Sequence, residues 1–194
     1  MNVKVVCTTD DPTDNLNYHQ QIARENRYTK VYPAFRSDNL FLIGQEGFRG
    51  YLKKLAAVAK FPINSYADLL RGIDNRIDFF HQNGCRLSDF GLGGAHAIVD
   101  FTEDEISTVF NKFINGGKLS PSEIVQYQSG IFLHLLKKYH EKGCVQQYHL
   151  GAIRDNNSRL QKQLGTDAGC DSIGDFPMAD FLSKLLNRLD ETDQ

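Results

Sequence analysis

Four short apolar segments recur along this chain, and each is followed by a polar loop and a longer segment with a helical pattern. The apolar segments are residues 3–7, 30–35, 85–89 and 144–150. The clearest helical patterns cover residues 46–60, 66–82, two stretches within 102–142, and a last segment around Phe181–Leu189. Alternation of this kind is typical of parallel βα units. The sequence therefore predicts an α/β fold with a parallel sheet.

Capping patterns mark the start of two helices between the third and fourth strands. Thr102 with Glu105, and Ser120 with Glu123, have the spacing of a capping box, in which the two side chains satisfy free backbone N–H groups. We expect the helices within 102–142 to form an insertion between two strands of a single domain.

The composition excludes several classes of protein. Among 194 residues, 22 Lys and Arg face 24 Asp and Glu, so no basic surplus points to a nucleic-acid partner. No apolar run reaches the roughly 18 residues of a membrane span, and the first residues do not resemble a signal peptide. The four cysteines form no C-x-x-C pair. We interpret them as reduced, mostly buried thiols of a cytoplasmic protein.

Polar residues gather where the four predicted strands end. In parallel α/β folds, ligands bind at the carboxyl ends of the strands. Four polar ends that converge on one rim would suit a polar, anionic small molecule. The residues concerned are Thr8, Thr9, Asp10 and Asp11; Arg36 and Asp38; Arg86, Ser88 and Asp89; and His149, Arg154, Asn156 and Asn157.

Each of these residues also has a purely structural interpretation. Asp11 before Pro12 can cap a helix, since proline is tolerated at the first helical position. Arg36 can be an ordinary surface arginine, although its planar fork of donors suits a carboxylate. A lone strand histidine such as His149 is more often structural than catalytic.

Common catalytic motifs are missing from the chain. Asp89–Gly91 matches the kinase tripeptide DFG, but none of the other kinase motifs accompanies it. No zinc-binding HxH or HExxH, dinucleotide-binding glycine motif, P-loop or nucleophile elbow occurs. The short motifs alone therefore do not indicate which reaction the protein catalyses.

Longer strings give a more specific indication. The chain contains VKVVCTTDDPTDNLNYH, YPAFRSDN, GCRLSDFG, QQYHLGAIRDNNSR and LGTDAGCDSIGD. In these strings it resembles the uronate (glucuronate) isomerase family of the amidohydrolase superfamily. The resemblance implies a (β/α)8 barrel with a divalent metal, for which zinc is the first candidate. It also implies interconversion of D-glucuronate with D-fructuronate and of D-galacturonate with D-tagaturonate.

The resemblance implies an internal fragment, a partial TIM barrel of about strands two to five. The family's H-x-H metal ligands would precede Met1, and its T-D-S-R segment would follow Gln194. The family usually has histidine where this chain has Phe90. We therefore expect residues 1–194 alone to be inactive.

Roles for individual residues follow from the resemblance. It implies that Arg36 anchors the substrate carboxylate and that Thr9, Asp10 and Asp89 also contact the substrate. His149 and Arg154 are the implied catalytic residues; His149 is also a candidate metal ligand, with the main ligands outside this chain. The implied partner is a hexuronate, without nucleic acid or membrane, and a homo-oligomer is left open.

Two other classes remain open on the sequence. One is a different metal-dependent hydrolase of the same superfamily. The other is a non-catalytic fragment or interaction module, which the short length and Phe90 favour. An assay for uronate conversion separates the isomerase from the hydrolase, and the non-catalytic fragment predicts no turnover at all.

Overall fold

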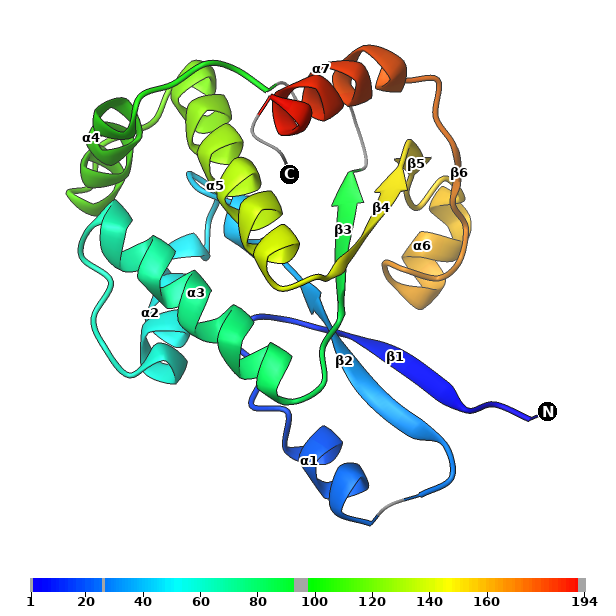
Figure 1. The fold of residues 1–194 in the computed structure, drawn as a ribbon. Coiled ribbons are helices and arrows are strands. Elements are labelled where there is room, and N and C mark those ends of the chain that lie inside the picture. Colours follow the sequence, from blue (N-terminus) through cyan, green and yellow to red (C-terminus); the bar gives the residue numbers. More distant parts are fainter. Residues whose placement is uncertain (1, 26, 93–97, 192–194) are drawn as a thin grey trace. The chain divides into compact units, whose positions relative to one another are not determined.

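The computed structural model describes residues 2–25, 27–92 and 98–191. Figure 1 shows the order of the elements along the chain. The strands are β1 (Val5–Asp10), β2 (Lys30–Arg36), β3 (Leu87–Leu92), β4 (Val145–Leu150), β5 (Ala152–Ile153) and β6 (Ser172–Ile173). The helices are α1 (Asn17–Arg24), the short 3-10 helix η1 (Asp38–Phe41), α2 (Phe48–Ala59), α3 (Tyr66–Gln82), α4 (Glu103–Ile114), α5 (Pro121–Glu141), α6 (Ser158–Leu164) and α7 (Met178–Asp190).

The chain divides into two compact units. The first contains the residues up to Asp89 together with Val99–Gln147, and the second contains Phe90–Ile98 and the residues from Tyr148 onward. Whether these residues form one domain with an insertion at 102–142 stays a prediction.

A four-stranded sheet has the order β1-β2-β3-β4. β1 and β2 are parallel, as are β2 and β3. The register sets Asp10 beside Phe35 and Arg36 beside Asp89. The predicted α/β fold with parallel strands is confirmed. A second, two-stranded sheet pairs β5 and β6 antiparallel, and its short strands were not predicted.

Two strands begin and end later than the sequence predicts. β1 runs to Asp10 instead of ending at residue 7, so Thr8 and Thr9 lie within the strand. Threonine is β-branched and suits a strand, and the parallel partner β2 continues alongside as far as Phe35. β3 begins at Leu87, so Arg86 lies before the strand and not at its carboxyl end. The prediction of Arg86 as a strand-end residue was wrong.

The predicted helix start at Asp11 and Pro12 was also wrong. The Asp11 carboxylate accepts hydrogen bonds from the backbone N–H and the hydroxyl of Thr13, at 2.8 and 2.6 Å. These local bonds close a turn in place of a helix cap. Helix α1 begins only at Asn17, after Leu16 has adopted a left-handed conformation with φ of 54°.

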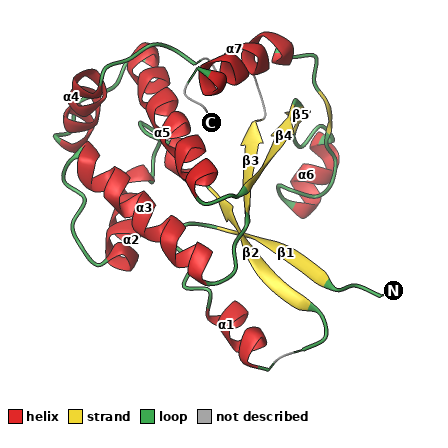
Figure 2. Cartoon of the chain, in the orientation of Figure 1, coloured by secondary structure: helices red, strands yellow, loops and turns green. Residues whose placement is uncertain are grey.

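Helices α3, α4 and α5 pack against one another in the first unit (Figure 2), and their aromatic side chains meet in its core. Both predicted capping boxes are confirmed, with the side-chain and backbone bonds present at Thr102 and at Ser120. Tyr127 of α5 is fully buried, stacks on Phe110 of α4, and donates a 2.9 Å hydrogen bond to the carbonyl of Leu40. That bond satisfies a backbone oxygen that would otherwise be buried without a partner.

Helix α3 has an apolar face on which Tyr66, Leu69, Ile73, Ile77 and Phe80 are buried and Leu70 is half-buried. The same helix buries Arg76, which donates to the carbonyls of Pro12 and Asp14, each at 2.8 Å. Burial lowers the pKa of Arg76, and the two carbonyls satisfy donors that a buried guanidinium cannot leave unpaired. Arg76 thereby fixes the turn that follows β1.

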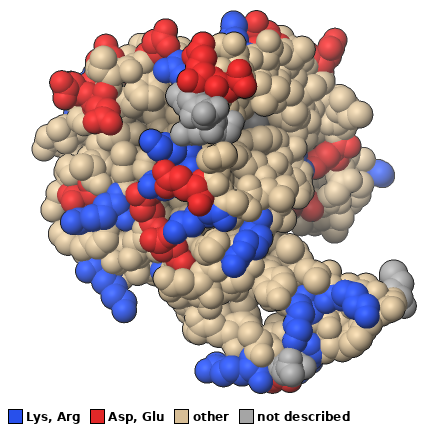
Figure 3. Space-filling view, viewed as in Figure 1, with Lys and Arg blue, Asp and Glu red and all other residues tan. Residues whose placement is uncertain are grey.

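The charged side chains on the surface are mixed in sign. Figure 3 shows acidic and basic residues interspersed on the face in view. Between α3 and α5, Asp74 pairs with both His134 and Lys138, and Asp78 pairs with Lys142. No helix in the described part of the chain is both long and apolar enough to cross a membrane.

The cysteines differ from the expectation of mostly buried thiols. All four are free, but only Cys85 is buried, whereas Cys7 is exposed and the other two are half-buried. Burial raises the pKa of the Cys85 thiol to about 11. Cys7 lies exposed because β1 is the outer strand of the sheet order.

Candidate active site

The ends of β2 and β3 bring an arginine between two carboxylates. Arg36 donates from Nε to Asp38 at 2.9 Å and from Nη1 to Asp89 at 3.4 Å. The parallel register makes Arg36 and Asp89 direct neighbours. The Asp89 side chain is only 6% exposed, whereas that of Arg36 is 36% exposed. The guanidinium is therefore held by a buried carboxylate while part of it remains exposed to solvent.

The end of β1 points its polar side chains in two directions. Thr8 Oγ1 donates to Asp10 at 2.6 Å and lies 2.7 Å from Nε2 of His19, a buried residue of α1. Successive side chains of a strand alternate between faces. Thr8 and Asp10 therefore share the face toward α1, and the exposed Thr9 lies on the opposite face. A role for Thr9 and Asp10 in substrate binding stays a prediction.

Asp11 links the end of β1 to the loop after β2. Its Oδ2 accepts a 2.8 Å hydrogen bond from the side-chain amide of Asn39 in η1. Burial, reinforced by the negative charge of Asp11, raises the pKa of the Tyr51 phenol, so this hydroxyl stays protonated at neutral pH. The link fixes η1 and, with it, the neighbouring residue Asp38 that pairs with Arg36.

The second unit holds the other predicted catalytic residues. His149 is half-buried near the end of β4. Arg154 is exposed after β5 and donates to Asp171 at 2.5 Å. The Arg154 guanidinium, with help from the backbone N–H of Asp155, holds the pKa of the Asp171 carboxyl below its usual value. Both charges therefore persist at neutral pH.

The structure thus gathers the predicted residues into separate groups. Arg36 and Asp89 meet in the first unit, whereas His149 and Arg154 belong to the second. Sequence reasoning did not single out Asp171 or Asn39. No short motif reveals either, because each bonds to a residue 17 or 28 positions away.

A metal site is not complete in the described part of this chain. Those residues contain no group of three or more His, Cys, Asp or Glu side chains that could hold a metal ion. Catalytic metals usually have about three protein ligands or more. His149 and the neighbouring side chains therefore do not form a metal site by themselves.

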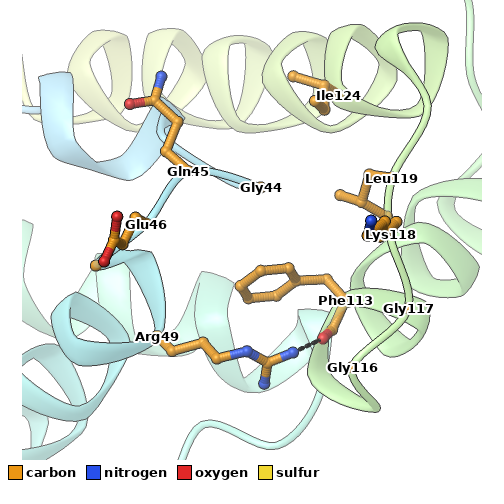
Figure 4. A pocket seen from close by; sticks show the side chains of 11 residues that line it. Gly44, Gln45, Glu46, Arg49, Phe113, Gly116, Gly117, Lys118, Leu119 and Ile124 are labelled. Atoms are coloured by element: carbon orange, nitrogen blue, oxygen red, sulfur yellow. Dashed lines mark hydrogen bonds between the residues drawn. The ribbon is translucent and has the colours of Figure 1, made fainter.

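The structure also contains a cavity away from the strand ends. It has a volume of about 550 Å³ and lies between the Gly44–Gly47 loop and the α4–α5 connection. Figure 4 shows Arg49 and Phe113 at its wall. Arg49 stacks over the Phe113 ring at 4.5 Å and donates to the Phe113 and Ile114 carbonyls. Arg49 thus caps the end of α4, so its donors serve the fold.

A sheet in the sequential order β1-β2-β3-β4, with helices in its connections, is consistent with the class of partial (β/α)8 barrels. The chain belongs to the glucuronate isomerase family, whose family model matches residues 1–194.

Named relatives and solved structures agree with this assignment. Over all 194 residues the chain is 45% identical to the uronate isomerase of Flavobacterium johnsoniae and 43% identical to that of Shouchella clausii. The crystal structure of uronate isomerase from Thermotoga maritima matches 97% of the chain and 42% of its own, with a TM-score of 0.87 and 28% identity. Glucuronate isomerase from Caulobacter crescentus matches 97% of the chain and 39% of its own, with a TM-score of 0.80 and 26% identity. The chain spans 41% of the length of the two curated relatives.

Proposed function

We propose that residues 1–194 supply substrate-binding and catalytic groups to a uronate isomerase. The proposed reactions interconvert D-glucuronate with D-fructuronate and D-galacturonate with D-tagaturonate. The observation that carries the proposal is the pair of Arg36 and Asp89 at neighbouring strand ends, in a chain 45% identical to a named uronate isomerase.

The reaction moves one proton from C2 to C1 of the sugar through an enediolate, and nothing enters or leaves overall. It needs an anchor for the distant carboxylate and stabilisation of the charge that develops on oxygen. Arg36 is the proposed anchor, because its planar fork can bind a carboxylate in two places. Asp89 holds Arg36 in position and can accept a bond from a sugar hydroxyl.

The remaining predicted residues have supporting parts in this proposal. Arg154 would donate to the sugar oxygens that gain negative charge, and His149 would hold or move a proton beside the substrate. Thr9 and Asp10 would contact the sugar from β1. The complete enzyme would hold a divalent metal, with zinc as the first candidate. His149 is the candidate ligand on this chain. A cytoplasmic location is supported by the four free thiols.

The test is a full-length hybrid enzyme. Residues 1–194 replace the matching segment of the Flavobacterium johnsoniae uronate isomerase, and conversion of glucuronate and galacturonate is followed. The hybrid should convert at least one of the two uronates, and an Arg36→Ala hybrid should lose that activity. A hybrid that folds like the parent enzyme but converts neither uronate would refute the proposal.

A further inference from the structure

Arg154 and Asp171 face each other across the continuation of the β5–β6 ladder. In that antiparallel pair Ala152 lies opposite Ile173, and Ile153 lies opposite Ser172. Continuing the register by one residue makes Arg154 and Asp171 the next facing pair. Their side chains meet at 2.5 Å. Opposite charges at facing positions of an antiparallel pair attract each other directly.

Asp171 is itself fixed in place by the loop around it. One carboxylate oxygen bonds Arg154, and the other accepts the backbone N–H of Asp155 at 3.1 Å. Asp155 has a positive φ of 54°, which is uncommon for a residue other than glycine. Asn156 closes the same loop, since its N–H donates to the Cys170 carbonyl at 2.8 Å and its amide to Ser172 Oγ at 2.7 Å.

The order of this loop matters because Arg154 is a long side chain with a 46% exposed surface. An arginine in solvent samples many rotamers, and a substrate that binds it must first select one of them. A carboxylate that already holds the guanidinium removes that requirement.

We propose that Asp171 is a positioning residue for Arg154, and that it holds the guanidinium ready to donate to the substrate's hydroxyl or enediolate oxygens. This inference rests on the proposed function. The role acts through Arg154, so Asp171 does not itself touch the substrate.

The experiment is a double-mutant cycle in the full-length hybrid, with kcat and KM for glucuronate as readouts. Asp171→Asn should lower kcat/KM by on the order of tenfold, as expected for the loss of one charge-assisted bond. In an Arg154→Ala background, which has no guanidinium left to position, the same change should have almost no further effect, because residues that act together are not additive. Asp171→Glu, which keeps the charge, should recover part of the loss.

Asp180→Asn is the matched control, because Asp180 pairs with Lys184 at 2.8 Å on the surface of α7 in the same unit. It should leave kcat/KM unchanged. Equal losses from Asp171→Asn in the parent hybrid and in the Arg154→Ala background would overturn the inference, since Asp171 would then act on the fold alone. Unchanged kcat/KM in Asp171→Asn would also overturn it.

Crystal structures of the parent and Asp171→Asn hybrids test positioning without relying on turnover. The Arg154 side chain should lose its single orientation in the variant. An identical, well-ordered guanidinium in both structures would overturn the inference even if the hybrid were inactive. A folded hybrid that positions Arg154 through Asp171 but converts no uronate would instead overturn the proposed function.

Discussion

The proposed role of Arg36 depends on the planar geometry of its guanidinium as well as on its charge. Its Nε and Nη1 bond two different carboxylates, on η1 and on β3. Lysine offers one compact ammonium group in place of a planar fork. A lysine at this position would therefore keep the charge and lose the orientation.

In the full-length hybrid, Arg36→Lys should lower kcat/KM for glucuronate. The loss of transition-state stabilisation calculated from the ratio of kcat/KM values should be about 1–3 kcal/mol, the range for hydrogen bonds to charged groups. The control is Arg71→Lys, at an exposed residue of α3 that pairs with Asp68. It should leave the kinetics at the parent level. Parent-like kinetics in Arg36→Lys would contradict the assignment of the carboxylate anchor.

A substitution of Tyr127 tests how much one buried hydrogen bond stabilises the core of the first unit. Its hydroxyl donates to the Leu40 carbonyl in a fully buried environment. Tyr127→Phe keeps the ring packing and leaves that carbonyl without a partner, so the free energy of unfolding should fall by about 1–3 kcal/mol. Chemical denaturation of the chain measures the change. Tyr18→Phe, at an 81% exposed position, should leave the midpoint unchanged.

At the scale of the element, the start of α5 makes stability depend on pH. The Lys112 side chain, together with the Ser120 backbone N–H, lowers the pKa of Glu123 from 4.5 to about 2. A carboxyl whose pKa is lower in the folded state stabilises it above the unfolded pKa and loses that effect as pH falls. The contribution should therefore be complete above about pH 4.5 and disappear toward pH 2.

Glu123→Gln removes the titrating group and should make stability less dependent on pH in that range. The measurement compares unfolding midpoints between about pH 2 and about pH 6 for the parent chain and the variant. Glu46→Gln, at an exposed turn before α2, controls for the loss of one negative charge. Parallel curves for the parent and Glu123→Gln would show that the capping box does not set this pH dependence.

The capping boxes were predictable because all their partners lie within four residues. The apolar face of α3 was predictable for a similar reason, since a repeating pattern over 17 residues is a strong signal. Asp11 was misinterpreted because its bonds to Thr13 and Asn39 decide between a turn and a helix cap. β5 and β6 have two residues each and are too short for any periodicity.

The candidate site was predictable only in part. The rule that ligands bind at strand ends selected Arg36 and Asp89, and their register makes them neighbours. The same rule could not reveal that Thr9 and Asp10 lie on opposite faces of β1, because β1 extends three residues beyond its predicted end. Nor could it find Asp171, whose partner depends on an antiparallel pair absent from the pattern.

At the scale of the whole molecule, residues 1–194 alone should not isomerise uronates. A (β/α)8 barrel takes about 250 residues, and the described residues contain no group of three or more His, Cys, Asp or Glu side chains that could hold a metal ion. The outer strand β1 also exposes Val5 and Val6, at 53% and 41%, and such an edge favours association between chains.

The test uses purified residues 1–194 with added zinc or manganese, and fructuronate formation from glucuronate is followed. No turnover above a mock preparation is expected. A His149→Ala chain, purified in the same way, is the control. Metal-dependent turnover that disappears in this control would show that the catalytic groups lie within the chain after all.

The order of the sheet has a consequence for how the chain is made. The strands follow one another in space as they do in sequence. As the ribosome releases the polypeptide, each new strand can therefore pair with the strand synthesised just before it. No strand has to be inserted later between two that are already paired. A doubly wound sheet differs in that its strand order reverses direction partway along the chain, so new strands are added at both of its borders. The sheet can thus grow at one border only, in step with translation.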